Sequence, residues 1–335
     1  MIKINSFSLP GIILILLAFF VSCSTPGDPA VNSRAVPFDI ADVRLTEGPF
    51  LKATRLNEQI LLEYEPDRFL AKFRLEAGLE PRAEHYHGWE DHTIAGHSLG
   101  HYLTAICLMY KSTGNEEFRE RAIYVTDELN SCQQADGEGY IGAFPGGKEI
   151  LEDEVAKGNI RAKGFDLNGI WVPFYTQHKV LSGLNHVYTS FGDRKALDIN
   201  IRFADWVSGI VGPLTDDQVQ EMLNCEHGGI NESLSELYHL TGQDNYLELS
   251  KIFQHRAIID PITEDRDILA GKHANTQIPK FVGLARRYEL TGDERDRLGA
   301  LNFWGMMVNH HSYVTGGNGN HEYLGEPDQL NDHLS

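Results

Sequence analysis

The chain has 335 residues, enough for one large domain or two smaller ones. Its hydrophobic content of 41% and charged content of 23% are those of an ordinary globular protein. The net charge of −19 argues against a nucleic-acid partner, because phosphate backbones bind basic faces, and it makes a neutral ligand a better match for this surface than a polyanion.

The N-terminal segment has the features of an export signal. An apolar run over residues 9–21 is too short for a typical membrane span, and it stops just before Cys23. This pattern predicts a lipoprotein signal peptide over residues 1–22, lipidation at Cys23 and a flexible tether over residues 23–37. The protein would then be periplasmic or anchored in the outer membrane, touching a membrane through its lipid only. The alternative is a plain secretory signal with an incidental cysteine.

From about residue 50 onward, apolar residues recur at helical spacing in one segment after another. Strand patterns are few, with short candidates at residues 39–45 and 312–314. The sequence therefore predicts a mainly α domain over residues 38–335. The predicted helical segments are 57–73, 91–112, 180–190, 231–240, 246–259, 277–290 and 294–308.

An internal repeat links these helices. Four of them end at a glycine that follows a tyrosine by four positions, and the last three of these glycines are 50 residues apart. A glycine just past a helix end supplies a left-handed cap, and the polar residue after it starts the next helix. Tandem hairpins of this period predict a solenoid or a closed α/α barrel. The four glycines are Gly114, Gly192, Gly242 and Gly292.

Long loops rich in glycine and aromatic residues favour the barrel. They cover residues 84–90, 137–163 and 315–327, and such loops gathered at one end are what a barrel active site needs. In the first loop, Trp89 is a candidate platform for a sugar ring, although a buried capping role is the alternative. His97 and His101 have the spacing of a metal pair, but packed or lumen-facing histidines are the favoured interpretation.

Three polar motifs each lie at the start of a predicted helix and offer candidate ligand contacts. The candidates are Gln177 with His178, Glu226 with His227, and His273. In each motif the alternative is an ordinary polar helix start. The glycine-rich stretch 313–327 lacks the ending of a phosphate loop and presents Glu322 and Glu326 on non-helical backbone, so it is a candidate site loop, with a surface loop as the alternative.

These motifs, in this order, resemble glycoside hydrolase families 127 and 146, the β-L-arabinofuranosidase group. The resemblance covers about residue 38 to the end. It implies an (α/α)6 barrel followed by β-sandwich domains, and a retaining mechanism with a cysteine nucleophile held on zinc. The matching stretches are GWE at 88–90, GHSLGHYL at 96–103, WVPFYTQHK at 171–179, GGINE at 228–232, HANTQIPK at 273–280 and YVTGGN at 313–318.

The resemblance assigns roles to individual residues. The family's zinc ligands are one Glu and three Cys, and the Glu best matches Glu322, with Glu326 as the alternative. The acid/base Glu and the nucleophilic Cys are expected after Ser335, so no catalytic residue, an incomplete barrel and no β-sandwich are expected within this chain. The predicted substrate-binding residues are Trp89, Gln177, His178, Glu226, His227 and His273.

The expected function is exo-acting β-L-arabinofuranosidase activity on oligosaccharides or polysaccharides of plant type. The 335-residue chain alone is expected to be inactive, because Cys107, Cys132 and Cys225 do not match the family's cysteine motifs. It is also expected to aggregate, because an unfinished barrel exposes an apolar flank. The alternatives are another α/α-barrel sugar enzyme (an epimerase or lyase), a non-catalytic glycan-binding lipoprotein, and a structural helical repeat protein.

Overall fold

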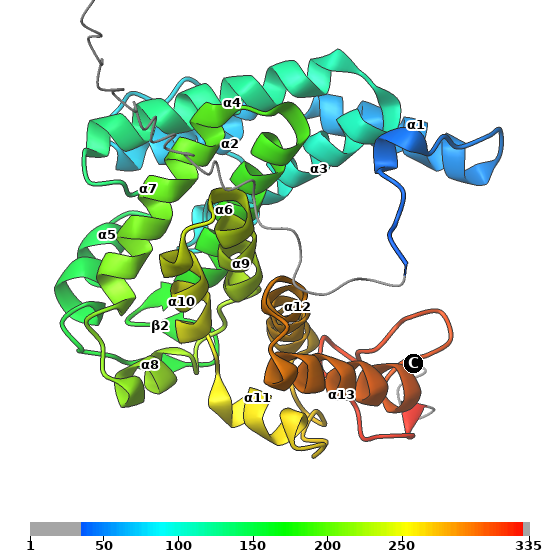
Figure 1. Ribbon diagram of the computed structural model, residues 1–335. Coiled ribbons are helices and arrows are strands. Elements are labelled where there is room, and N and C mark those ends of the chain that lie inside the picture. The colour runs from blue at the N-terminus through cyan, green and yellow to red at the C-terminus, as the bar shows by residue number, and fades with distance from the viewer. Residues whose placement is uncertain (1–34, 331–335) are drawn as a thin grey trace, which may run out of the picture.

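The computed structural model describes residues 35–330, and the fold is mainly α, as predicted (Figure 1). The predicted signal peptide, Cys23 and most of the predicted tether lie outside the described residues. The helices are α1 (Pro49–Glu63), α2 (Pro66–Glu76), α3 (His97–Thr113), α4 (Glu116–Asp136), α5 (Gly147–Ile150), α6 (Pro173–Phe191), α7 (Arg194–Val211), α8 (Asp216–Met222), α9 (Ile230–Thr241), α10 (Asp244–Ile252), α11 (Arg256–Thr263), α12 (Ala274–Thr291) and α13 (Glu294–His310).

The helices form hairpins that stack in two layers. Helices α3, α6, α9 and α12 contact one another in succession and make the inner layer, and each packs against the helix that follows it, α4, α7, α10 or α13 (Figure 1). The largest hydrophobic core lies between these layers from Leu61 to Phe253, and a second core joins α11, α12 and α13. This arrangement is the one expected of an α/α barrel, and the described residues contain no β-sandwich domain.

The predicted repeat of helix caps is present in all four hairpins. Each of the four glycines has a positive φ between 67° and 75°. The N–H of each donates to the carbonyl of the tyrosine four positions earlier, as Gly242 does to Tyr238 at 2.7 Å. In three hairpins the next residue, Asn115, Asp193 or Asp293, then caps the following helix with its side chain. The shared turn sets the same reversal of direction at the end of every hairpin.

Several predicted elements were wrong, for local reasons. Residues 39–45 contain a 3-10 turn (Ile40–Asp42) in place of a strand, because the Asp39 carboxylate caps it. Residues 312–314 form no strand, and they lead into a turn in which the Gly316 N–H donates to the Tyr313 carbonyl. The predicted helix 57–73 is two helices, because Pro66 starts α2 after an extended Tyr64. The predicted helix 246–259 is also interrupted, between Ile252 and Arg256.

The sequence pattern also missed α4 and α7, the outer helices of the first two hairpins, whose apolar residues alternate with many charged ones. Between α5 and α6 lie a short π-helical turn (Leu151–Val155) and a small antiparallel sheet of three strands, β1 (Ala162–Lys163), β2 (Asp166–Leu167) and β3 (Ile170–Trp171). This sheet holds the long loop that leads to α6 and brings Trp171 to the same end of the molecule as the other long loops.

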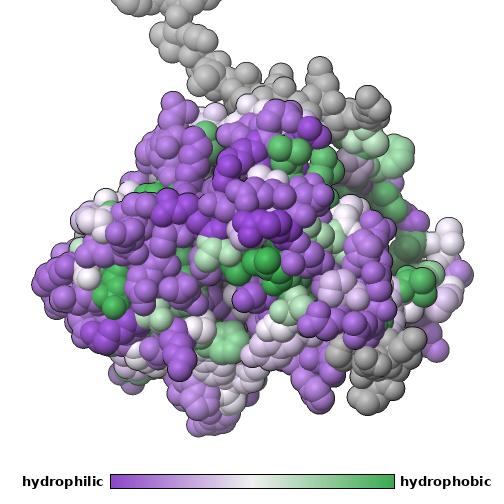
Figure 2. Space-filling view, turned by 90° about the horizontal axis from the view of Figure 1, so that it is seen from below, coloured by the Kyte–Doolittle hydropathy of each residue, from purple (hydrophilic) through white to green (hydrophobic). Residues whose placement is uncertain are grey.

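Hydrophilic side chains cover most of the face in Figure 2, and apolar ones form small separate patches. Among residues 35–330, no helix has both the length and the apolar character that crossing a bilayer requires. Helix α13 carries exposed apolar residues at roughly helical spacing, namely Leu298, Leu301, Trp304 and Val308.

Glycines allow the inner helices to approach closely. A Cβ at Gly100 of α3 would lie 2.2 Å from the backbone carbonyl carbon of Lys179 in α6, and one at Gly183 would lie 3.0 Å from the Gly100 oxygen. Between α9 and α12, a Cβ at Gly283 would lie 2.2 Å from the Asn231 side chain. The spacing of the inner layer thus depends on positions without a side chain.

We expect Gly100→Ala to lower the free energy of unfolding by about 1–3 kcal/mol, because the added methyl group overlaps backbone atoms that cannot move aside cheaply. Gly209→Ala is the matched control, since it lies within α7 and its Cβ would meet nothing within 4 Å. That change should stabilise the protein by about 0.5–1 kcal/mol through helix propensity. Urea unfolding followed by circular dichroism measures both, and equal stability of the two variants would contradict the close-packing account.

Candidate functional site

A cavity of about 510 Å³ opens where the long loops meet the first turns of the inner helices. Its wall combines aromatic side chains with two carboxylates, a histidine and amides. Four of the residues predicted from sequence line it: Trp89, Glu226, His273 and Glu322. The remaining lining residues are Ile94, Phe165, Trp171, Val172, Tyr175, Ala274, Asn275, Ile278, Asn318 and Gly319.

Backbone pairing carries Glu322 to this cavity. Residues 271–274 lie beside residues 322–324, with a bridge between His273 and Tyr323. The Ala274 N–H donates to the Glu322 carbonyl at 2.8 Å, and Leu324 and Lys272 pair in the same way. Glu322 itself adopts φ = 71°, a left-handed conformation that turns the chain at this point. The glycine-rich loop is therefore fastened to the start of α12.

His273 lies between the two carboxylates of the cavity. Its Nδ1 accepts the Thr276 N–H that it caps at the start of α12, so its Nε2 carries the proton in the neutral ring. That Nε2 lies 3.3 Å from Glu322 Oε2, while Nδ1 lies 3.8 Å from Glu226 Oε2. The rings of Phe165 and Tyr323 meet the imidazole edge-on at 5.1 and 5.4 Å and fix its plane.

Glu226 is the buried carboxylate of the cavity, with 4% of its surface exposed. Its backbone N–H donates to the Gly164 carbonyl, which ties the loop before α9 to the small sheet. Its side chain accepts a hydrogen bond of 3.3 Å from Asn275 Nδ2. Burial raises the pKa of Glu226 above its ordinary value, against the lowering effect of Thr276, His273 and lysines. Glu322, by contrast, is largely exposed.

Aromatic side chains form another part of the cavity wall. The Trp89 ring is 58% exposed and lies 5.6 Å from the ring of Trp171. The backbone N–H of Trp171 donates to Thr93 Oγ1, and this hydrogen bond joins the two loops that carry the tryptophans. Exposed indole faces beside carboxylates and amides are the combination that binds the apolar face and the hydroxyls of a sugar.

The other three predicted substrate-binding residues, Gln177, His178 and His227, do not line this cavity but are buried close to its wall. His178 Nδ1 accepts the Gly229 N–H at 3.1 Å, and a Cβ at Gly228 would lie 2.7 Å from the same nitrogen. Gly228 and Gly229 have no side chains, and this leaves room for the His178 imidazole. Burial holds the pKa of His178 and of His227 well below the usual value, so both rings are neutral.

Some buried polar atoms near the cavity have no hydrogen-bond partner among the described residues. They include both side-chain groups of Gln177 and Nε2 of His227 and of His255. Buried polar groups are nearly always paired with protein or water, so these atoms are free to bind water or a ligand. The roles of Gln177, His178 and His227 as substrate contacts stay predictions.

Sequence reasoning missed Lys280, one of the most deeply buried side chains. Its ammonium donates to Gln277 Oε1 and lies 3.0 Å from His255 Nδ1. Burial lowers the pKa of Lys280 to about 7, and the charge of Glu226 partly opposes this shift. Lys280 belongs to the sequence motif at 273–280. Its burial and its electrostatic interaction with Glu226 are what associate it with the site.

The described residues do not assemble a zinc–thiolate centre. Glu322 lies at the cavity and Glu326 does not. The choice of Glu322 as a zinc ligand stays a prediction. However, no described cysteine lines the cavity, and Cys107, Cys132 and Cys225 are all buried. Burial raises the pKa of Cys225 to about 12, so its thiol stays protonated. Zinc would find one of its four expected ligands here.

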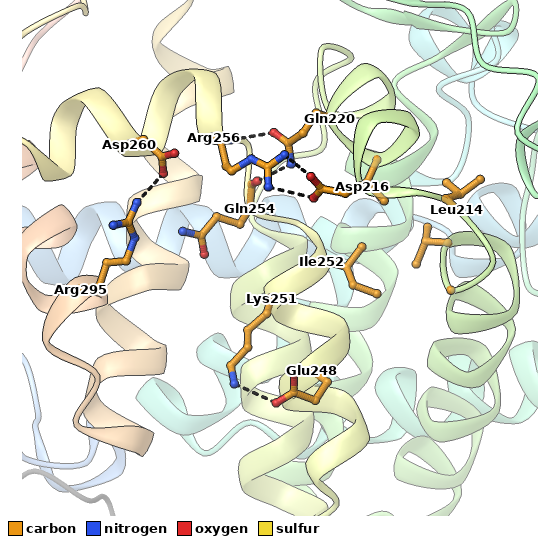
Figure 3. A pocket seen from close by; sticks show the side chains of 13 residues that line it. Leu214, Asp216, Gln220, Glu248, Lys251, Ile252, Gln254, Arg256, Asp260 and Arg295 are labelled. Atoms are coloured by element: carbon orange, nitrogen blue, oxygen red, sulfur yellow. Dashed lines mark hydrogen bonds and ion pairs between the residues drawn. The ribbon is translucent and has the colours of Figure 1, made fainter.

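A second cavity, of about 480 Å³, lies between α7, α8, α10, α11 and α13 (Figure 3). Its charged groups pair with one another: Arg256 binds Asp216 with both guanidinium ends, and Arg295 binds Asp260 at 2.8 Å. None of the residues predicted from sequence lines it. The first cavity is therefore the candidate site.

Comparison with known structures supports the fold. The chain is similar to a GH127 β-L-arabinofuranosidase from Geobacillus stearothermophilus T6, with a TM-score of 0.56 and 20% identity, over 81% of this chain and 44% of that one. It is also similar to a GH127 β-arabinofuranosidase with a TM-score of 0.62 and 19% identity, over 90% of this chain and 47% of that one. The chain thus spans about half the length of these structures.

No curated protein matches the chain. The family profile for the β-L-arabinofuranosidase GH127 catalytic domain matches residues 42–335, which is most of the sequence. The match includes every residue that lines the candidate site. The chain therefore belongs to the GH127 family, whose catalytic domain this profile describes.

Proposed function

We propose that this protein is an exo-acting, retaining β-L-arabinofuranosidase of plant-type glycans and that the described residues form its sugar-binding pocket. The observation that carries the proposal is the arrangement at His273, whose imidazole lies between the Glu322 and Glu226 carboxylates in a cavity that exposed Trp89 also lines. The choice of L-arabinofuranose, the retention of configuration and the exo preference rest on membership of the family.

The pocket can hold a small neutral sugar by two kinds of contact. The indole of Trp89 offers a flat face for the C–H groups of a ring, and the Glu322 carboxylate accepts hydrogen bonds from hydroxyls. Asn275 and the His273 N–H donate to sugar oxygens. Because burial raises the pKa of Glu226, that carboxyl is the candidate proton donor, and the exposed Glu322 carboxylate is positioned to accept hydrogen bonds from hydroxyls.

Hydrolysis with retention needs a nucleophile on one face of the sugar and an acid near the leaving oxygen. The family resemblance gives the first role to a zinc-bound cysteine, whose metal keeps the thiol ionised. Of the four expected zinc ligands, only Glu322 lies at the described cavity, so the described residues do not fit that zinc site. What these residues do is bind the sugar, orient it against the tryptophans and place two carboxylates beside it.

A second candidate function is a glycan-binding lipoprotein without catalysis, because the exposed indole of Trp89 and the polar groups of the pocket are sufficient for binding a sugar. Both candidates use the same pocket and differ only in turnover. In either case we propose that Cys23 carries a lipid and that the exported protein contacts a membrane through this anchor alone.

The binding proposal is tested with methyl β-L-arabinofuranoside, titrated into the full chain by ligand-observed NMR. We expect saturable binding, and we expect His273→Ala to weaken it by about tenfold or more, because it leaves sugar and carboxylate groups without their donor. Arg256→Ala is the control, since it alters only the second cavity (Figure 3). Equal affinity for wild type and His273→Ala would reject the pocket.

Turnover separates the two functions. We expect no release of nitrophenol from p-nitrophenyl β-L-arabinofuranoside by the 335-residue chain, because no described thiol lines the pocket and a carboxylate pair alone lacks the family's nucleophile. Spectrophotometry at 400 nm, set against a buffer blank, is sensitive enough for slow turnover. Hydrolysis that disappears in Glu226→Gln or Glu322→Gln would show that these carboxylates perform the chemistry and that the cysteine assignment is wrong.

Lipidation is tested in a bacterial host by detergent phase partition. The wild-type protein is expected in the detergent phase, and Cys23→Ala is expected in the aqueous phase, because the acyl chains attach through that sulfur. Cys107→Ala serves as the control for loss of a thiol elsewhere. Aqueous partition of the wild-type protein would favour the plain secretory signal.

A further inference from the structure

The loop between α2 and α3 gathers two histidines and an aspartate outside the pocket. Within residues 35–330, His85, His87 and Asp91 are the one group of three potential metal-binding side chains whose ligand atoms all lie within 4.8 Å of one another. His85 is partly exposed, and the other two are exposed, so a hydrated ion can reach them. The cysteines and Glu322 take no part in this group.

The distances suit the first coordination shell of a small metal ion. Asp91 Oδ1 lies 2.8 Å from His85 Nε2 and 3.3 Å from His87 Nδ1. Around tetrahedral zinc, with bonds of about 2.0–2.1 Å, neighbouring ligand atoms are about 3.3 Å apart. The side chains therefore need only small movements to admit an ion between them.

Outer contacts already orient two of the three ligands. The other ring nitrogen of His87, Nε2, lies 3.3 Å from Glu84 Oε1, which is the carboxylate–histidine–metal arrangement that fixes a ligand's tautomer. The second oxygen of Asp91, Oδ2, accepts the Gly88 N–H at 2.8 Å. This leaves Nδ1 of His87 and Oδ1 of Asp91 facing the same point.

We propose that His85, His87 and Asp91 bind one divalent transition-metal ion, with water completing its coordination. Two imidazoles and one carboxylate favour Zn²⁺, Co²⁺ or Ni²⁺ over Ca²⁺ and Mg²⁺, which prefer oxygen ligands. The site is separate from the zinc expected at Glu322. Bound metal would hold the 3-10 turn Gly88–Asp91, and that turn carries Trp89 of the sugar pocket.

The site is tested on the full chain, purified without a histidine tag and stripped with EDTA. Co²⁺ is titrated while its visible absorbance is recorded. We expect one ion per chain, with His87→Ala and Asp91→Asn each weakening the affinity by about 10–100-fold, and Glu84→Gln by a smaller factor. His310→Ala is the matched control, because His310 and Asp328 form a surface pair at 3.0 Å that has no third ligand in the described chain.

Two further outcomes decide the proposal. Glu322→Gln should leave the Co²⁺ affinity unchanged, because Glu322 is not part of the group. Ni²⁺ should quench tryptophan fluorescence in wild type and quench it less in Trp89→Phe, because Trp89 lies in the turn that the metal would hold while the neighbouring Trp171 stays in place. Circular dichroism confirms that each variant keeps its helices. Co²⁺ binding that is absent in wild type, or equal in wild type, His87→Ala and Asp91→Asn, would overturn the proposal.

Discussion

The close approach of successive inner helices is the constraint on which the candidate site depends. Gly100 places the backbone of α3 against that of α6, and Gly283 admits the Asn231 side chain between α9 and α12. These contacts bring the first turns of α6, α9 and α12 to one end of the molecule, where the sugar-contacting candidates begin. A wider spacing would separate Tyr175, Glu226 and His273, which now line one cavity.

Helix starts alone would leave that end open, and the long loops complete it. The strand-like pairing of residues 271–274 with 322–324 fixes Glu322 beside His273, and the Thr93–Trp171 hydrogen bond joins the two tryptophan loops. Beneath the cavity, neutral histidines and Lys280 form a buried polar layer. Such a layer is costly unless its groups are paired, so its retention next to the cavity agrees with a ligand-binding role.

Periodic apolar residues and glycine caps were sufficient to predict the fold class and the hairpin repeat. Gly192, Gly242 and Gly292 adopt the left-handed conformation that their spacing indicated. The strand predicted at 39–45 failed because the side chain of Asp39 caps a turn, which is a contact that alternation of residue types does not encode. The outer helices α4 and α7 were missed because charged residues interrupt the apolar periodicity of both segments.

The site was predictable in part. Motif order brought Trp89, Glu226, His273 and Glu322 under consideration, and the structure places all four at one cavity. Which histidines line the cavity was not predictable, because it depends on three-dimensional packing. His178 accepts the Gly229 N–H, whereas His273 faces the carboxylates. Lys280 and the metal-binding candidates at 85–91 could be identified only from the distances between side chains.

The most direct test of the account is a crystal structure of the full chain soaked with methyl β-L-arabinofuranoside. The account predicts furanose density in the first cavity, with the ring against Trp89 and hydroxyls within hydrogen-bond distance of His273 and Glu322. Density only in the second cavity beside Arg256 (Figure 3), or an empty first cavity at a saturating concentration, would contradict it.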